Sequence, residues 1–449
     1  MKAPELLAPA GSLAMARTAL DFGATAIYAG QPRYSLRVRN NDFGSLEKLA
    51  EGIRCTHLRG GKFYLVSNIL PHNAKLRTYL DDMAPVVALK PDALIMADPG
   101  LMLMIRERWP AMPIHLSVQA NTVNHAAVRF WHGIGVTRVI LSRELSLDEV
   151  AEIRQQCPDT ELEVFVHGAL CIAYSGHCLL SGYFNHRDPN QGSCTNSCRW
   201  DYKVHEGKED AAGDVALAAP RPLAAAPAPA PTPASATKPS ALRRPGATWL
   251  LEEKERPGEY MPIEEDEHGS YILNSKDLRA IEYVARLAEI GIDSLKIEGR
   301  TKSPYYVART CQSYRRAIDD AVAGRPFDAR LVGQLDGLAN RGYTAGFFDR
   351  HPDRDYQNYL RGSSESSRSL YVGDVVGYDA GGLAEIAVKN HFAVGDRIEV
   401  IRPAGNLELV IEAMNNRDGE AVTVAPGSGH LMRVALPPGC EGAFVAKYL

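Results

Sequence analysis

Short runs of β-forming residues alternate with amphipathic helical stretches along most of this chain. The expected helices begin in several cases with Ser or Asn at a capping position, and they cover residues 12–22, 76–87, 124–131, 146–156 and 275–290. The expected strands cover residues 5–10, 26–29, 62–69, 93–97, 114–118, 138–141, 161–166 and 294–297. This alternation predicts an α/β fold with a parallel sheet, and eight strands favour a closed (β/α)8 barrel of the TIM type. A doubly wound sheet is the alternative.

Two changes of composition divide the chain further. Residues 206–255 are rich in Ala and Pro and offer few large apolar side chains, which predicts a disordered insert. The insert separates residues 1–205, with the first seven strands and a cysteine-containing loop, from residues 256–360, which complete the barrel with the eighth strand and helices. Short alternating strands with Gly and Pro turns then predict a small all-β barrel domain over residues 369–449.

Charge and hydropathy limit the possible partners. The 449 residues include 50 Lys and Arg against 54 Asp and Glu, a net charge of −4, which argues against coating nucleic acid by bulk charge but allows a local basic surface. The N-terminal residues lack the apolar region of a signal peptide, and no apolar run approaches the roughly 18 residues of a membrane span. We therefore expect a cytoplasmic protein in a reducing compartment, where clustered cysteines indicate metal binding or catalysis.

Half of the eight cysteines lie within 28 consecutive residues, with the spacing C-x6-C-x15-C-x3-C. These are Cys171, Cys178, Cys194 and Cys198, and they follow the expected seventh strand on the face where such barrels perform chemistry. Four thiolates suit an iron-sulfur cluster or tetrahedral zinc, and the absence of C-x2-C pairs favours the cluster. Zinc and four unrelated buried thiols remain the alternatives. The other cysteines are expected to pack as small apolar residues, and they are Cys55, Cys157, Cys311 and Cys440.

Several longer segments carry a family resemblance. The sequences EVFVHGALC at 163–171 and GHCLLS at 176–181, together with PRYSLRVRNN and CTNSC, resemble the collagenase-like peptidase family of unassigned catalytic type. The resemblance extends over nearly the whole chain except the Ala/Pro insert. It is strongest to the branch of the family whose members hydroxylate tRNA uridine in a prephenate-dependent reaction.

The resemblance implies a 4Fe-4S cluster held by the four clustered cysteines and oxidation of the wobble uridine of certain tRNAs at ring carbon 5. It further implies prephenate as co-substrate and the tRNA anticodon loop as partner, and no stable protein partner is expected. The sequence contains neither H-E-x-x-H nor G-x-S-x-G, so the peptidase name has little chemical support in it. A peptidase, with zinc in the cysteine site, and a non-catalytic iron-sulfur RNA-binding protein remain the alternatives.

Polar residues at the ends of the expected strands give candidates for the site, because these ends meet at one face of a barrel. His167 and Glu298 are candidate catalytic groups, although His167 also suits a hydrogen bond that fixes the cysteine loop, and Glu298 suits an ion pair with a neighbouring Lys or Arg. Prephenate has two carboxylates, which a guanidinium binds in a bidentate manner. The expected substrate-binding residues are Asn68, Gln119, Arg143 and Arg300.

An arginine-bearing segment follows the second expected strand. Arg33, Arg37 and Arg39 lie close together without an acidic residue, and Tyr34 adds an aromatic ring. This combination suits contacts with phosphates and stacking on a splayed RNA base, so we predict RNA binding here. A solvated loop is the alternative.

Overall fold

The computed structural model describes residues 1–36, 41–170, 202–209, 215–217, 248–253, 260–263, 265–266, 269–270, 276–340, 342–349 and 369–449. Two compact units divide the chain. The first comprises residues 1–195, 275–358 and 364–449, and the second comprises residues 196–274 and 359–363.

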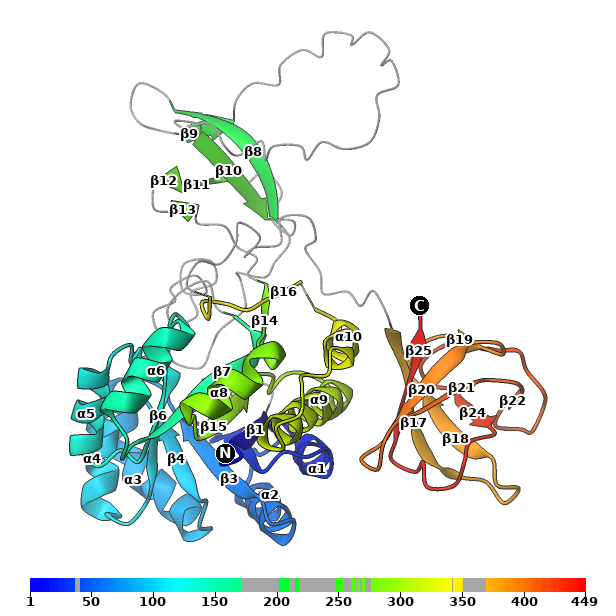
Figure 1. The fold of residues 1–449 in the computed structure, drawn as a ribbon, viewed down its shortest axis with the longest axis horizontal. Helices are drawn as coiled ribbons and strands as arrows, with labels where there is room; N and C mark the ends of the chain where they lie inside the picture. The colour runs from blue at the N-terminus through cyan, green and yellow to red at the C-terminus, as the bar shows by residue number, and fades with distance from the viewer. Residues whose placement is uncertain are drawn as a thin grey trace. The chain divides into compact units, whose positions relative to one another are not determined.

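Within the described part of the chain, eight parallel strands form a closed barrel (Figure 1). The ring closes because β15 (Ser294–Ile297) pairs in parallel with both β1 and β7. Nearly every residue of these strands is buried, as expected where helices cover the outer face of a parallel sheet. The predicted TIM-type barrel is therefore confirmed. The remaining strands are β1 (Glu5–Pro9), β2 (Ala26–Gly30), β3 (Lys62–Ser67), β4 (Ala93–Met96), β5 (Ile114–Leu116), β6 (Arg138–Ile140) and β7 (Glu161–Ala169).

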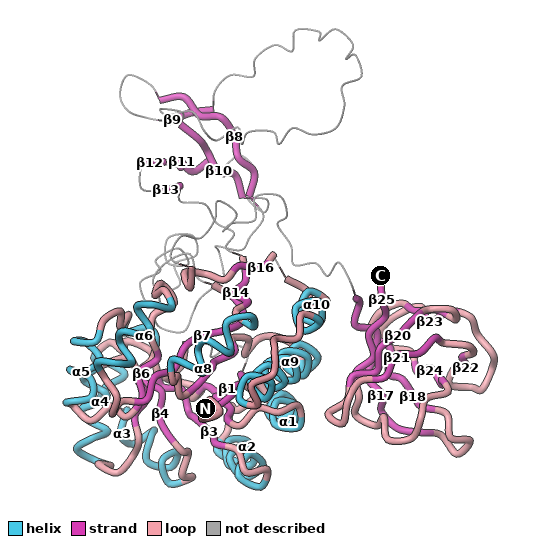
Figure 2. Tube along the Cα trace, viewed as in Figure 1, coloured by secondary structure: helices cyan, strands magenta, loops and turns pink. Residues whose placement is uncertain are grey.

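Helices surround the ring of strands (Figure 2). The predicted caps hold: the side chains of Ser12 and Asn124 accept hydrogen bonds from the main-chain N–H groups three residues ahead, and Ser146 forms a full capping box with Glu149. No helix in the described ranges is long and apolar enough to cross a membrane. The helices are α1 (Leu13–Asp21), α2 (Leu46–Leu58), α3 (Asn73–Ala88), α4 (Pro99–Arg108), α5 (His125–Gly133), α6 (Leu147–Gln156), α8 (Val284–Ile290), α9 (Pro304–Val322) and α10 (Arg330–Asp336), with 3-10 turns η1 (Val118–Ala120) and η4 (Ile281–Tyr283).

The single helix predicted over residues 275–290 is wrong in its first half. Residues Asp277–Arg279 form strand β14, which pairs antiparallel with the end of β7 and parallel with β16 (Tyr343–Thr344). The end of β7 extends beyond the barrel ring, and its unpaired main-chain groups are satisfied by this strand rather than by a helix. The helical part is restricted to η4 and α8.

The second unit contains a further antiparallel sheet. Strands β8 (Tyr202–Glu209), β9 (Val215–Leu217), β10 (Thr248–Glu253) and β11 (Tyr260–Ile263) form an antiparallel sheet, and β12 (Glu265–Asp266) pairs with β13 (Gly269–Ser270). Parts of the predicted disordered insert are thus strands, and residues 256–274 belong to this unit instead of the barrel. The run TWLLEE of β10 has the large apolar residues that the Ala/Pro tract lacks. Residues 218–247, the tract itself, lie outside the described residues.

Residues 369–449 form a curled antiparallel sheet, as expected for a small all-β domain. This sheet encloses its own apolar core, which contains Val372, Ile386, Ile398 and Val445. On the barrel side, Arg309 of α9 pairs with Glu399 of β20, and both residues are almost fully buried. The sheet has the strand order β21 (Leu407–Val410), β20 (Arg397–Ile401), β25 (Phe444–Tyr448), β17 (Ser369–Tyr378), β18 (Ala384–Val388), β24 (Leu431–Val434) and β22 (Met414–Asn415), and β19 (Phe392–Ala393) pairs with β23 (Val424–Ala425).

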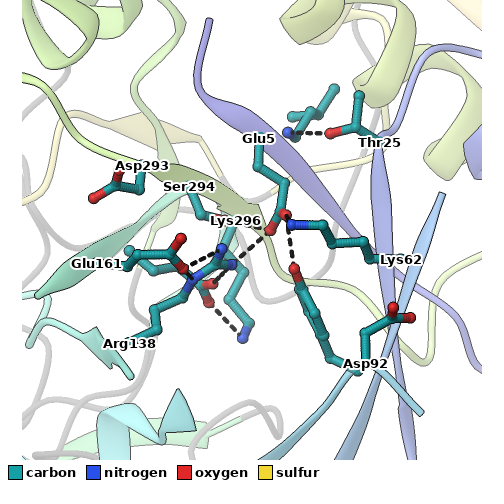
Figure 3. Close-up of polar contacts among 12 residues, drawn as sticks. Glu5, Thr25, Lys62, Asp92, Arg138, Glu161, Asp293, Ser294 and Lys296 are labelled. Atoms are coloured by element: carbon teal, nitrogen blue, oxygen red, sulfur yellow. Dashed lines mark hydrogen bonds and ion pairs between the residues drawn. The ribbon is translucent and has the colours of Figure 1, made fainter. Parts of the chain in front are cut away.

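The barrel interior contains a charge-balanced network (Figure 3). Arg138 Nη1 lies 2.6 Å from Glu5 Oε1 and 3.2 Å from Glu163 Oε2, and Lys296 Nζ lies 2.8 Å from Glu163 Oε1. Two carboxylates and two cations from β1, β6, β7 and β15 therefore compensate one another inside the protein. Burial alone would raise the pKa of Glu5, but the guanidinium of Arg138 and its hydrogen bonds hold that pKa below its usual value.

The network predicts a stability effect that depends on charge balance. Lys296→Met leaves the two buried carboxylates with a single buried cation, and we expect it to lower the free energy of unfolding by about 3–5 kcal/mol. Adding Glu163→Leu removes one carboxylate and leaves the Glu5–Arg138 pair, so much of the loss is expected to return. Urea unfolding of Lys296→Met, Glu163→Leu and the double variant measures this. The prediction is contradicted if the double variant loses as much free energy of unfolding as the two single variants together.

Candidate active site

Two of the predicted substrate-binding residues are joined by a hydrogen-bonded chain at the ends of β3 and β5. Asn68 Nδ2 donates to Ser117 Oγ at 3.2 Å, and Ser117 Oγ donates to Gln119 Oε1 at 3.2 Å. Asn68 Oδ1 also accepts from the main-chain N–H of Leu36 at 3.3 Å, which fixes the loop after β2. Asn68 and Gln119 are nearly buried. The structure thus brings them together and gives both a fixed orientation.

Arg143 follows β6, and its guanidinium lies over the ring of Phe165 in β7. The centre of its guanidinium is 3.9 Å from the centroid of the Phe165 ring, and Nη1 donates to the main-chain oxygen of Ala169 at 3.1 Å. A guanidinium over a ring face is attracted by the ring quadrupole and loses little flexibility on binding an anion. Arg143 is therefore a preorganised cation at the C-terminal ends of the strands.

Arg300 follows β15, and its guanidinium centre lies 5.7 Å from the ring of Tyr28. Burial raises the pKa of Tyr28, the charge of Glu298 adds to that effect, and the charges of Arg300 and Arg143 oppose it. Both arginines therefore act on the same phenol, whose hydroxyl donates to the main-chain oxygen of Ile297 at 2.9 Å. The two predicted arginines lie around one point of the barrel mouth, a geometry suited to an anion with two charges.

Lys296 lies beneath this site, and we did not predict it from the sequence. Its Nζ is 4.5 Å from the Tyr28 ring centroid and 5.4 Å from that of Phe165. Burial lowers the pKa of Lys296, and Glu163 opposes this effect. The strand sequence SLKI carries a signal for it, because a lysine in a short strand buried on both faces must find a partner inside the barrel.

His167 faces the helices rather than the barrel interior. The register between β15 and β7 shifts after Lys296, so that Ile297 is opposite His167 and Val166 is the extra residue of a bulge. The imidazole packs against Tyr306, Tyr314 and Tyr343, with ring centroids 5.4–5.8 Å away. Nδ1 lies 3.4 Å from the Tyr314 hydroxyl, and Nε2 has no hydrogen-bond partner among the described residues.

Burial in this cage lowers the pKa of His167 to about 3, with Lys302 and Arg279 adding to the effect. The imidazole is therefore neutral near pH 7. These contacts favour the hypothesis that His167 fixes the end of β7, ahead of the cysteine segment. A catalytic role for His167 stays a prediction.

Glu298 connects β15 to the end of β7 through its main chain. Its N–H donates to the carbonyl of His167 at 2.8 Å, and its own carbonyl accepts from the Tyr306 hydroxyl at 3.0 Å. The side chain is half-buried, and its charge acts on the Tyr28 hydroxyl. Its predicted role as a general base remains a prediction.

The arginine-bearing segment is described only in part. Arg33 is exposed and pairs with Asp82 at 2.7 Å, whereas Arg37 and Arg39 lie outside the described residues. The Tyr34 side chain is fully buried, with its ring 4.8 Å from that of Tyr79, and its hydroxyl contacts Asp82. Tyr34 thus packs between β2 and α3 and has no face for a base to stack on, which corrects its predicted RNA-binding role.

The four clustered cysteines also lie outside the described residues. They are Cys171, Cys178, Cys194 and Cys198. In the described ranges, no group of three or more His, Cys, Asp and Glu residues is placed to hold a metal ion. The other four cysteines are buried free thiols, which confirms their predicted packing role.

The cage around His167 predicts a pH effect. Between pH 6.5, the ordinary histidine pKa, and the folded value of about 3, the unfolded chain binds a proton that the folded chain excludes. Stability should therefore fall with decreasing pH in this window, by about 1.4 kcal/mol per pH unit from this group. Urea unfolding between these limits should give a shallower pH dependence for His167→Phe, and an unchanged slope contradicts the proposed neutrality. His132→Phe, at an exposed histidine, is the control.

Two family models and several curated proteins match this chain. The model of Peptidase family U32 matches residues 11–358, and that of the Peptidase family U32 C-terminal domain matches residues 367–445. The "tRNA hydroxylation protein P" of Escherichia coli (strain K12) is 57% identical over 98% of this chain and 95% of its own length. The protein of the same name from Haemophilus influenzae is 55% identical over 97% of this chain and 93% of its own length.

Among solved structures, the C-terminal domain of a Geobacillus thermoleovorans putative U32 peptidase is 26% identical over 17% of this chain and 98% of that one, with a TM-score of 0.17. The structure of the U32 peptidase Mk0906 is 16% identical over 36% of this chain and 69% of that one, with a TM-score of 0.31. The two family models together span nearly the whole sequence, and the two curated relatives match over almost their full length. The chain therefore belongs to peptidase family U32.

Proposed function

We propose that this chain is a tRNA-modifying enzyme that hydroxylates the wobble uridine at ring carbon 5. The observation that carries the proposal is the identity of 57% and 55% to two relatives named tRNA hydroxylation protein P, over nearly the full length of all three chains. Such coverage includes both the barrel and the C-terminal domain. Hydroxylation at the uridine ring is the finer part of the proposal and rests on the sequence segments around the cysteines.

The proposed cofactor is a 4Fe-4S cluster bound by Cys171, Cys178, Cys194 and Cys198. Four soft thiolates in 28 residues are the donor set that such a cluster requires. The first of them follows β7, which ends at Ala169, so the segment begins at the rim that also carries Arg143 and Arg300. When bound, the cluster would supply one-electron redox chemistry.

The proposed co-substrate is prephenate, and its binding residues would be Arg143 and Arg300. Its two carboxylates match two guanidinium groups that both act on Tyr28. Asn68 and Gln119, which their hydrogen bonds hold in place, would supply amide groups to the ring hydroxyl or to the uracil. Both are fixed before any ligand binds, which reduces the entropy cost of binding.

The proposed RNA contact is the loop after β2. Arg33 is exposed, and a tRNA phosphate would replace Asp82 as its partner. Arg37 and Arg39 would extend the same contact along the RNA backbone. The Tyr34 ring is excluded from this role by its burial.

The nucleosides of tRNA test the function directly. We expect that 5-hydroxyuridine-derived nucleosides disappear from the tRNA of a deletion strain, and that the wild-type gene restores them. Liquid chromatography with mass spectrometry measures both. Arg143→Lys, which keeps the charge but loses the bidentate fork, should restore them poorly. An unchanged nucleoside profile after deletion would sink the proposed reaction.

The cluster is tested on anaerobically purified protein. Cys171→Ala should remove the iron, the acid-labile sulfide and the brown absorption together, whereas Cys311→Ala, at a buried thiol of α9, should retain all three. Metal and sulfide analysis measures the difference. Stoichiometric zinc without iron or sulfide in the wild-type protein contradicts the cluster and favours the peptidase alternative.

A further inference from the structure

Two polar groups meet beside Gly30, the last residue of β2. A Cβ atom placed on Gly30 would lie 2.5 Å from Ser35 Oγ and 2.8 Å from Arg300 Nη1, both closer than atoms approach without displacement. Glycine alone therefore leaves room for the hydroxyl and the guanidinium to lie against the end of β2. Gly30, Ser35 and Arg300 are called the serine–arginine site below.

The hydroxyl of Ser35 is buried and has no hydrogen-bond partner among the described residues. Its main-chain N–H is already engaged, because it donates to the carbonyl of Gln31 at 3.2 Å. A buried hydroxyl without a partner costs free energy, so such a group indicates a ligand that completes it. Ser35 is therefore a buried polar group without a partner in the described part of the chain, and its hydroxyl lies near Arg300 Nη1 at the end of β2.

The turn that carries Ser35 is held in one conformation. The side-chain oxygen of Gln31 accepts from the main-chain N–H groups of Arg33 at 2.6 Å and Tyr34 at 2.7 Å. The buried ring of Tyr34 anchors one side of Ser35, and Asn68 anchors the other through the N–H of Leu36. Groups held in this way by their neighbours are typical of preorganised binding sites.

The chemistry of the site fits a carboxylate. A guanidinium supplies charge and a fork of N–H donors, and a serine hydroxyl adds a further donor to the same oxygen atoms. An RNA phosphate is a second anion with this chemistry, but Arg300 is 9% exposed and Ser35 is fully buried, a depth that suits a small ligand inside the mouth. Arg143 lies over the Phe165 ring, and its charge also acts on Tyr28, so a second carboxylate of the same ligand would meet a second guanidinium.

We propose that Ser35 and Arg300 together bind one carboxylate of the small-molecule co-substrate, and that Gly30 determines specificity by leaving the space that this pair occupies. This inference rests on the proposed function, in which the co-substrate is the dicarboxylate prephenate. Ser35 is a binding residue in this scheme, and Gln31 and Tyr34 are positioning residues that hold its turn.

Isothermal titration of the full-length, cluster-loaded protein with prephenate tests the site. Ser35→Ala should weaken prephenate binding about tenfold, because it removes one hydrogen bond to a charged group. Gly30→Ala should weaken it at least as much by displacing both partners. Ser294→Ala, a buried serine at the opposite end of the barrel, and Gly44→Ala, whose Cβ would meet no atom within 4 Å, are the matched controls and should bind like the wild type.

A double-mutant cycle separates direct binding from a packing effect. If Ser35 and Arg300 bind the same carboxylate, Ser35→Ala combined with Arg300→Lys should weaken binding by less than the product of the two single effects. Thermal unfolding of each variant shows that the fold is retained. Independent, multiplicative effects would overturn the shared carboxylate.

Three further outcomes separate this inference from the proposed function and from phosphate binding. If the wild type binds prephenate and Ser35→Ala binds it with the same affinity, the serine–arginine site is overturned and the proposed function is not. No binding of prephenate to the wild type overturns both the site and prephenate dependence, and the nucleoside profile then decides on tRNA hydroxylation by itself. If Ser35→Ala weakens binding of an anticodon stem-loop RNA but not of prephenate, the site binds phosphate and the carboxylate assignment is wrong.

Discussion

The balanced charges of Glu5, Arg138, Glu163 and Lys296 are the constraint on which the barrel depends. Buried charges are stable only when they are paired and hydrogen-bonded, and these four come from β1, β6, β7 and β15. Arg138 and Glu163 come from neighbouring strands, whereas the Lys296–Glu163 and Glu5–Arg138 pairs join the two ends of the strand order and form when β15 lies between β7 and β1. Strand pairing closes the ring, and the ion pairs of Lys296 and Glu5 stabilise the closed form. An open, doubly wound sheet would keep the Arg138–Glu163 pair but would leave Glu5 and Lys296 without these partners.

The network also shapes the mouth, because Lys296 belongs to both. Its ammonium pairs with Glu163 on one side and lies near the rings of Tyr28 and Phe165 on the other. Arg143 lies on Phe165 and Arg300 lies near Tyr28. The order from the interior outward is thus carboxylate, ammonium, aromatic ring and guanidinium. Lys296 and Arg143 lie near the Phe165 ring, Lys296 and Arg300 lie near the Tyr28 ring, and the face of each ring attracts the cations beside it.

The sequence predicts those parts of this arrangement that depend on local patterns. The predicted strands at 26–29 and 294–297 and the caps at Ser12, Asn124 and Ser146 follow from alternation and capping chemistry. The positions of Arg143 and Arg300 on one rim follow from parallel topology.

What the sequence does not predict depends on contacts between distant segments. The orientation of His167 results from a bulge in the pairing of β7 with β15, more than 100 residues later, and no local pattern marks it. The burial of Tyr34 likewise requires Tyr79 and Asp82 of α3. The same contacts that bury Tyr34 hold the neighbouring Ser35 in place, and the local sequence pattern marks neither effect.

Contacts between distant segments also fix the end of β7. Gly168 has φ +106°, and a Cβ there would lie 2.6 Å from the carbonyl oxygen of Glu298, so only glycine allows β7 and β15 to approach this closely. The cage around His167, the pairing with β14 and the hydrogen bond from Arg143 to Ala169 fix the same few residues from three further directions. A segment that begins at Cys171 therefore starts from a rigid point beside the two guanidinium groups. Rigid attachment of this kind would suit the proposed cluster, because a cofactor that meets its substrate at short range needs a fixed position.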